Sequence, residues 1–181
     1  MRDRPTIGVL VDWIDDAYHA AVLSGIEDAA RRADANLLCF VGGVLRSPLR
    51  ASLMRNAVLE LAGPDTLDGI LVMGSLGNSV GAAGLGELVA RYRPLPIVSI
   101  AVPLDGCASV LVDNASGMRE ALLHLLDAHG RERVAFIRGP VANVEAEGRF
   151  QVYREVLAER GLALDPGLVA QGNFERASGA V

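Results

Sequence analysis

The sequence contains no lysine, and this absence excludes several kinds of chemistry. All 17 basic residues of the 181-residue chain are arginine. A Schiff-base lysine and a phosphate-loop lysine are therefore impossible on this chain. Cysteine is scarce too: Cys39 and Cys107 each lie in or beside an apolar run. We therefore expect buried, reduced thiols and no disulfide framework.

Long apolar runs are also absent, and aromatic residues are few. No apolar run approaches the roughly 20 residues of a membrane-spanning helix. The first apolar stretch is cut short by Asp12, Asp15 and Asp16, so it indicates a first strand and not a signal peptide. A cytoplasmic location without membrane association is expected. The net charge of −5 argues against direct binding to nucleic acid, which needs clustered basic residues.

What the sequence does have is a strict alternation of apolar strands and amphipathic helices. The predicted strands are Thr6–Val11, Asn36–Val41, Asp68–Met73, Pro96–Ile100, Val110–Val112, Val134–Ile137 and Leu168–Ala170. The predicted helices are Ala17–Ala33, Ser47–Leu61, Leu85–Tyr92, a helix from Asn114 to His129, Asn143–Arg160 and one beginning near Glu175. Such alternation predicts an α/β fold, a doubly wound parallel sheet with helices on both faces.

Ligands of such sheets bind outside the carboxyl ends of the strands, so functional motifs are expected in the loops there. The acidic loop Asp12–Asp16 resembles the metal site of a receiver domain, but that site also needs a lysine. Solvated carboxylates at the start of a helix are the simpler interpretation. Gly77–Gly81 spells a nucleophile elbow around Ser79, but three residues separate this stretch from the preceding strand. A flexible glycine loop is the simpler interpretation there.

The two histidines near the end of the fourth predicted helix are candidate metal ligands. His124 and His129 are five residues apart, which is poor spacing for a shared metal on an α-helix. The sequence thus predicts no catalytic residues, no metal and no cofactor.

Several segments taken together carry a resemblance to a known family. They are IGVLV at 7–11, GIEDAARRADANLL at 25–38, DGILV at 68–72, PIVSI at 96–100, VLVDN at 110–114, HGRERVAFIRGP at 129–140 and GRFQVYREVLAERGL at 148–162. In order and spacing the chain resembles the ligand-binding domain of LacI/GalR regulators, which is periplasmic-binding-protein-like of type I.

This resemblance implies two similar lobes with the ligand between them. Residues 1–112 would form a complete, Rossmann-like N-terminal lobe, and residues 113–181 a partial C-terminal lobe. Val112, Asp113 and Asn114 would form the first hinge. Members of the family continue further along the chain, so we expect a part of a longer protein, without the family's helix-turn-helix.

The resemblance also implies which side chains hold the ligand. The family's Asn-Pro-Phe-Phe is replaced here by Asp16-Ala17-Tyr18-His19, and its sugar-clamping Asp after the fourth strand by Ala101. Arg149 keeps the family's arginine, whose donors suit hydroxyls or a carboxylate. The predicted ligand-binding residues are Asp16, Tyr18, His19, Ser75 and Arg149. The expected ligand is a sugar-like or carboxylate-bearing metabolite.

The function that follows is non-enzymatic sensing of a small-molecule effector by a LacI-type transcription regulator or signalling protein. A homodimer is expected, because a partial second lobe would leave apolar faces, such as those of Phe136, Phe150 and Tyr153, without cover. Two alternatives stay open: a small enzyme of flavodoxin-like topology, and a dimerisation module that has lost its ligand.

Overall fold

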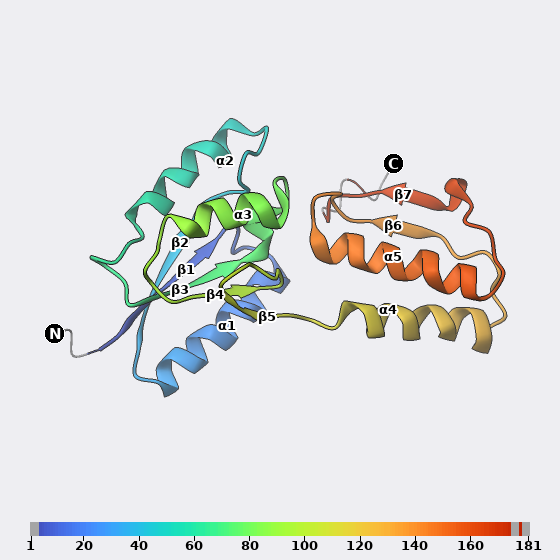
Figure 1. Cartoon of the computed structure of the whole chain (residues 1–181), viewed down its shortest axis with the longest axis horizontal. Helices are drawn as coiled ribbons and strands as arrows, with labels where there is room; N and C mark the ends of the chain where they lie inside the picture. The colour runs from blue at the N-terminus through green and yellow to red at the C-terminus, as the bar shows by residue number, and fades with distance from the viewer. Residues whose placement is uncertain (1–3, 175–177, 179–181) are drawn as a thin grey trace. The chain divides into compact units, whose positions relative to one another are not determined.

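The computed structural model describes residues 4–174 and 178, which fall into two compact units (Figure 1). The first unit is Met1–Leu111 and the second is Val112–Val181. Each unit has a sheet and a hydrophobic core of its own. No helix within the described residues is long and apolar enough to cross a membrane.

The first unit is built on a five-stranded parallel sheet. Its strands are β1 (Thr6–Val11), β2 (Asn36–Val41), β3 (Gly69–Met73), β4 (Ile97–Ile100) and β5 (Ala108–Val110). They lie in the order β2-β1-β3-β4-β5, and every neighbouring pair is parallel. The predicted α/β fold with a parallel sheet is therefore confirmed. The last strand begins earlier than predicted, and most of the apolar run Val110–Val112 lies beyond it, exposed.

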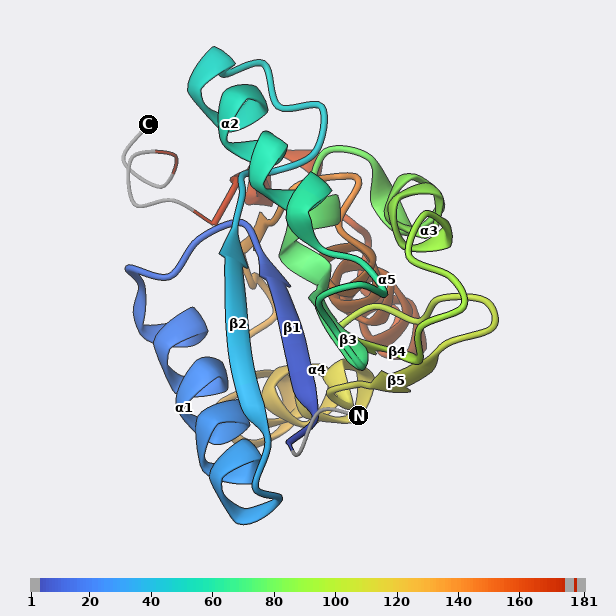
Figure 2. The same ribbon diagram turned by 90° about the vertical axis from the view of Figure 1, so that its left-hand side faces the viewer.

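Helices cover both faces of this sheet (Figure 2). Helix α1 (Ala17–Arg32) lies on one face. Helix α2 (Arg50–Arg55), the 3-10 helix that continues it over Asn56–Leu61, and α3 (Gly81–Ala90) lie on the other.

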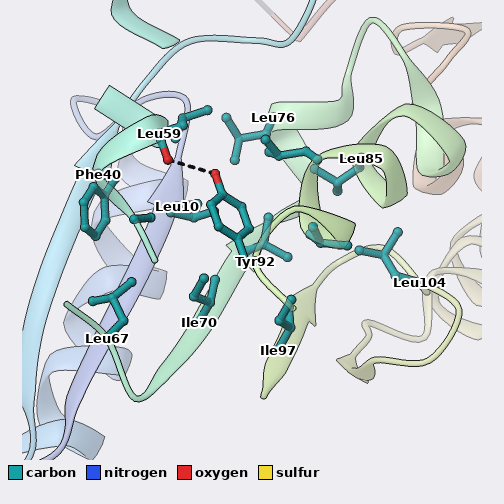
Figure 3. Close-up of a cluster of buried hydrophobic side chains, with 14 of the residues drawn as sticks. Leu10, Phe40, Leu59, Leu67, Ile70, Leu76, Leu85, Tyr92, Ile97 and Leu104 are labelled. Atoms are coloured by element: carbon teal, nitrogen blue, oxygen red, sulfur yellow. Dashed lines mark hydrogen bonds between the residues drawn. The ribbon is translucent and has the colours of Figure 1, made fainter. Parts of the chain in front are cut away.

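The main core fills the space between the sheet and the α2–α3 side (Figure 3). Aliphatic side chains from β1, β3 and β4 meet Leu76, Leu85 and Leu88 there. Tyr92 is buried among them, and its hydroxyl donates a hydrogen bond of 3.0 Å to the carbonyl oxygen of Leu59. Burial raises the pKa of Tyr92 to about 12.

The stripe that helix α1 turns toward the sheet agrees only in part with the one that the sequence predicts, since the two share Val22 and Ile26. We expected Ala21, Val22, Gly25, Ile26 and Ala29 to face inward, but the two alanines and the glycine are exposed. The less exposed stripe is His19, Val22, Leu23, Ile26 and Ala30. Apolar residues occupy so many positions of α1 that their period does not fix which face turns inward.

The second unit contains two helices and a small sheet. Its elements are α4 (Asn114–Leu123), a π-helical turn over His124–Ala128, β6 (Phe136–Arg138), α5 (Val144–Glu159), a short 3-10 helix over Pro166–Leu168 and β7 (Val169–Gln171). Strands β6 and β7 pair in parallel, separately from the first sheet. Asp113 and Asn143 cap α4 and α5, since each side chain accepts a hydrogen bond from a first-turn N–H. The predicted helix near Glu175 lies outside the described residues.

The core of the second unit is aromatic at its centre. Phe150 is 8% exposed and Tyr153 is 1% exposed, so the expectation that they lie uncovered is wrong. The ring of Phe136 is only half-buried and packs 4.8 Å from that of Tyr153. Leu122 and Leu126 from the α4 side close this cluster. Packing between α4 and α5 thus covers most of the surface that was expected to be open.

Candidate functional site

A polar cluster lies where β1 and β3 end. Asp12 follows β1 directly, and Ser75 lies in the 3-10 turn Gly74–Gly77 that follows β3. Because β1 and β3 are neighbours in a parallel sheet, their carboxyl ends bring these two side chains together across 63 residues of sequence. Asp12 is only 7% exposed, and the Ser75 hydroxyl donates a hydrogen bond to its Oδ1.

His19 completes the cluster from the first turn of α1. Its Nε2 lies 3.1 Å from the Ser75 Oγ and 3.3 Å from Asp12 Oδ1. Its Nδ1 lies 2.5 Å from Oδ2 of Asp16, the residue that caps α1 by accepting the backbone N–H of His19 at 2.9 Å. Burial acts to raise the pKa of the Asp16 carboxyl, but its hydrogen bonds with the backbone and ring of His19 outweigh burial and leave the pKa below its ordinary value.

This cluster is rich in acceptors and is anionic. It holds two carboxylates, an imidazole and a hydroxyl, and no arginine takes part in its hydrogen bonds within 4–174 and 178. Tyr18 lies beside it, half exposed, with its ring edge-on to that of His19 at a centroid distance of 5.3 Å. Such an arrangement suits hydroxyl or amino groups, which donate hydrogen bonds to carboxylates.

Four of the five predicted ligand-binding residues, Asp16, Tyr18, His19 and Ser75, are thus brought together in the first unit. Asp12 was missed, because the sequence favoured a solvated carboxylate at that position, and this expectation is wrong. Asp12 could have been identified from its position directly after β1, the strand that neighbours β3. Arg149 belongs to the second unit.

Comparison with known proteins agrees with this architecture. No protein-family model matches the chain. The transcriptional repressor PurR of Vibrio campbellii is 30% identical over 173 residues, which are 94% of this chain and 48% of that protein. The ribose operon repressor of Haemophilus influenzae is 26% identical over 181 residues, 100% of this chain and 51% of that protein. A LacI-family regulator from Mycobacterium smegmatis superposes with a TM-score of 0.77 at 25% identity, covering 96% of this chain and 58% of that one.

The resemblance to LacI-family regulators is confirmed. The chain spans about half the length of the curated relatives that it matches.

The chain departs from the LacI-family pattern at the two positions that follow β4. At the positions after β4, Ala101 and Val102 are both buried, and Val102 packs in the main core. Ala101 has a φ of 72°, which is unusual for a residue other than glycine. Gly74 lies against this segment, where a Cβ atom would come within 2.5 Å of the Val102 side chain. The two positions directly after β4 are therefore occupied by buried apolar side chains.

The predicted hinge and the arginine of the LacI-like pattern are joined in the second unit. Arg149 on α5 donates a hydrogen bond of 2.5 Å from Nη1 to Oδ1 of Asn114. Asn114 in turn donates from Nδ2 to Glu145 at 2.7 Å. Val112 is 66% exposed, and Asp113 caps α4 through a 3.0 Å hydrogen bond from the Ser116 N–H. Hydrogen bonds with Ser116 lower the pKa of the Asp113 carboxyl.

His124 and His129 lie closer together than their five-residue spacing in the sequence suggests. The Nε2 atoms of His124 and His129 lie 3.0 Å apart, because the helix changes to a π-helical turn between them. The five-residue spacing therefore does not keep the two side chains apart here, as it would on an α-helix, and the expectation of poor spacing is wrong. Among the described residues, no group of three or more potential metal ligands is present.

Proposed function

We propose that the chain is the ligand-binding part of a LacI-type transcription regulator or signalling protein. The observation that carries this proposal is the cluster of Asp12, His19 and Ser75, of which Asp12 and His19 are buried. It lies at the carboxyl ends of adjacent parallel strands, where such sheets bind ligands. The similarity to LacI-family repressors supports it. A cytoplasmic location is proposed because those relatives regulate transcription.

The ligand is proposed to be a sugar-like or carboxylate-bearing metabolite. In the first unit, the acceptors of Asp12 and Asp16 suit its hydroxyl groups, and the exposed ring of Tyr18 offers a flat face for stacking. The apolar end of β4 favours a ligand less polar than a free sugar on that side. In the second unit, Arg149 is proposed to bind a hydroxyl or carboxylate group, since its guanidinium has donors beyond the one used on Asn114.

The two units are proposed to be the two lobes of a sensor, with Val112, Asp113 and Asn114 as the hinge. Closure of lobes about a few residues is a common way for a ligand to change the state of such a protein. Direct contact with DNA is not proposed for this chain, because its net charge is −5.

The site is proposed to be non-catalytic, although one feature favours the enzyme alternative. Asp16, His19 and Ser75 follow one another through hydrogen bonds in the order of a hydrolase triad. The Ser75 hydroxyl, however, donates its hydrogen bond to the buried Asp12 carboxylate, so the O–H is not directed to the His19 ring. Hydrolysis of p-nitrophenyl acetate by the wild type and not by Ser75→Ala would contradict the non-catalytic proposal.

A homodimer is proposed, with the α2 side of the first unit as its contact surface. Leu49, Leu53 and Met54 form an exposed apolar group there, with Leu49 and Met54 each more than 60% exposed. Contiguous exposed apolar surface of this kind is typical of an interface.

The test of the sensing proposal is calorimetry on the full-length gene product. The probes are ribose, cellobiose and succinate, which sample a pentose, a disaccharide and a dicarboxylate. The probe that binds is then titrated into Tyr18→Ala, Arg149→Ala and the control Ser79→Ala, whose serine is exposed in the loop after β3. We expect at least about tenfold weaker binding for the first two variants, because each removes a direct contact, and no change for the control.

Two outcomes would contradict the proposal. If none of the three probes binds, the proposed ligand classes are wrong. If a probe binds both site variants as tightly as the wild type, the assignment of the site is wrong.

A further inference from the structure

The end of α4 carries a pair of histidines that the proposed sensing function does not use. His124 and His129 are both exposed, their ring planes are nearly perpendicular at 88°, and their centroids are 4.6 Å apart. Their Nε2 atoms face each other at 3.0 Å. The pair lies within the second unit, so its geometry does not depend on the first unit.

The backbone explains why these side chains meet. In an α-helix, residues five apart are rotated by about 140° from each other and project from different faces. A π-helical turn holds more residues per turn, so positions five apart come onto the same side. Here His124–Ala128 forms that turn, while Leu122 and Leu126 keep their places in the core. Turns of this kind occur frequently at functional sites.

The two Nε2 atoms are within hydrogen-bond distance of each other, and the separations also fit two nitrogens that bind one metal ion. With metal–nitrogen bonds of about 2.1 Å, nitrogens 3.0 Å apart subtend roughly 90° at a metal. Two imidazole rings pointing along those bonds have centroids about 4.6 Å apart, whereas a linear N–H···N hydrogen bond of the same length gives about 5.3 Å. The observed centroid distance is 4.6 Å.

We propose that His124 and His129 form a chelating site for a divalent transition-metal ion, Cu²⁺ or Ni²⁺. An angle near 90° suits the square-planar geometry of these ions, and a tetrahedral Zn²⁺ would hold the nitrogens about 3.4 Å apart. Imidazole nitrogen is a suitable ligand for both ions, and Cu²⁺ binds such sites most tightly. Nearby Asp127 is held by Arg160 through two hydrogen bonds of 3.0 and 2.7 Å, so water completes the coordination.

A bound ion would connect the π-helical turn to the residue that ends the helix. Gly130, which follows His129, has a φ of 59°, in the left-handed region that glycine adopts at helix ends. The metal would thus fix the last turn of α4 against the start of the loop that leads to β6. The expected consequence is a higher melting temperature of the second unit when metal is bound.

The test is titration of the chain, without a histidine tag, with CuCl₂ at about pH 7.5, where a free imidazole is mainly neutral. Calorimetry gives the affinity, and electron paramagnetic resonance counts the coordinating nitrogens. We expect one Cu²⁺ per chain with two nitrogen ligands. His124→Gln and His129→Gln should each bind on the order of 10- to 100-fold more weakly and show one nitrogen, because the second imidazole acts as an intramolecular ligand.

The control variant is Ser79→Ala, at an exposed position of the first unit, which leaves all three histidines in place. It should keep the affinity and the two-nitrogen spectrum of the wild type. Circular dichroism of each metal-free variant verifies that the helices are intact. A single nitrogen in the wild-type spectrum, or affinities of the two pair variants within twofold of the wild type, would overturn the proposal.

Discussion

Replacing Ser75 by alanine is expected to lower the free energy of unfolding of the first unit by about 2 kcal/mol. The Asp12 carboxylate is almost fully buried, and the Ser75 hydroxyl is a hydrogen-bond donor to it. Hydrogen bonds to charged groups contribute about 1.5–3 kcal/mol, and a buried acceptor left without its donor costs a similar amount. The His19 ring, 3.3 Å from the same oxygen, limits the loss because it can still interact with the carboxylate.

The chain supplies its own reporter for this measurement. Its single tryptophan, Trp13, directly follows Asp12, so urea unfolding monitored by tryptophan fluorescence reports on the first unit. The matched control is Ser79→Ala, the same substitution at an exposed position in the loop, where a change below about 0.5 kcal/mol is expected. Equal stabilities of Ser75→Ala and Ser79→Ala would refute the conclusion that Ser75 satisfies a buried carboxylate.

Two further predictions concern the main core and the proposed dimer. Tyr92→Phe should lower the unfolding free energy by about 1 kcal/mol, because it removes the hydrogen bond to Leu59. Since the folded-state pKa of Tyr92 is raised to about 12, from an ordinary value of about 10, the stability that it contributes is present below about pH 10 and lost between about pH 10 and 12. Alkaline unfolding curves should show this loss in the wild type and not in Tyr92→Phe. Met54→Glu places a charge in the exposed apolar group on α2 and should prevent dimer formation. Light scattering should therefore show a dimer for the wild type and a monomer for the variant. A monomeric wild type would contradict the proposed dimer.

The sheet was predictable because its strands are short apolar runs bounded by residues that end strands. Both ends of two strands, Thr6–Val11 and Asn36–Val41, were predicted to the residue. The alternation of strands with helices was enough to predict a parallel sheet. Helix ends were less accurate: the predicted helix Ser47–Leu61 begins at Arg50 and changes to a 3-10 helix at Asn56. The spacing of apolar residues predicts neither the change of helix type at Asn56 nor which face of α1 turns inward.

The candidate site was only partly predictable. That ligand-contacting loops lie at the carboxyl ends of the strands follows from the fold class, and this placed Tyr18, His19 and Ser75 in one region. The pairing of Asp12 with Ser75 depends on side-chain conformations and on the turn after β3, which local sequence does not determine. The histidine pair was missed because one additional residue in a helical turn changes which side chains share a face.

The hydrogen bonds of Asn114 have a consequence for any motion about the residues before it. Asn114 is the first residue of α4, and through Arg149 and Glu145 its side chain is attached to the first two turns of α5. A torsional change at Val112 or Asp113 would therefore turn both helices together, as one rigid body. Asn114→Ala would remove both bonds and so release the start of α4 from the helix that carries the arginine, while the packing of Leu122 and Leu126 still holds the rest of α4 against α5.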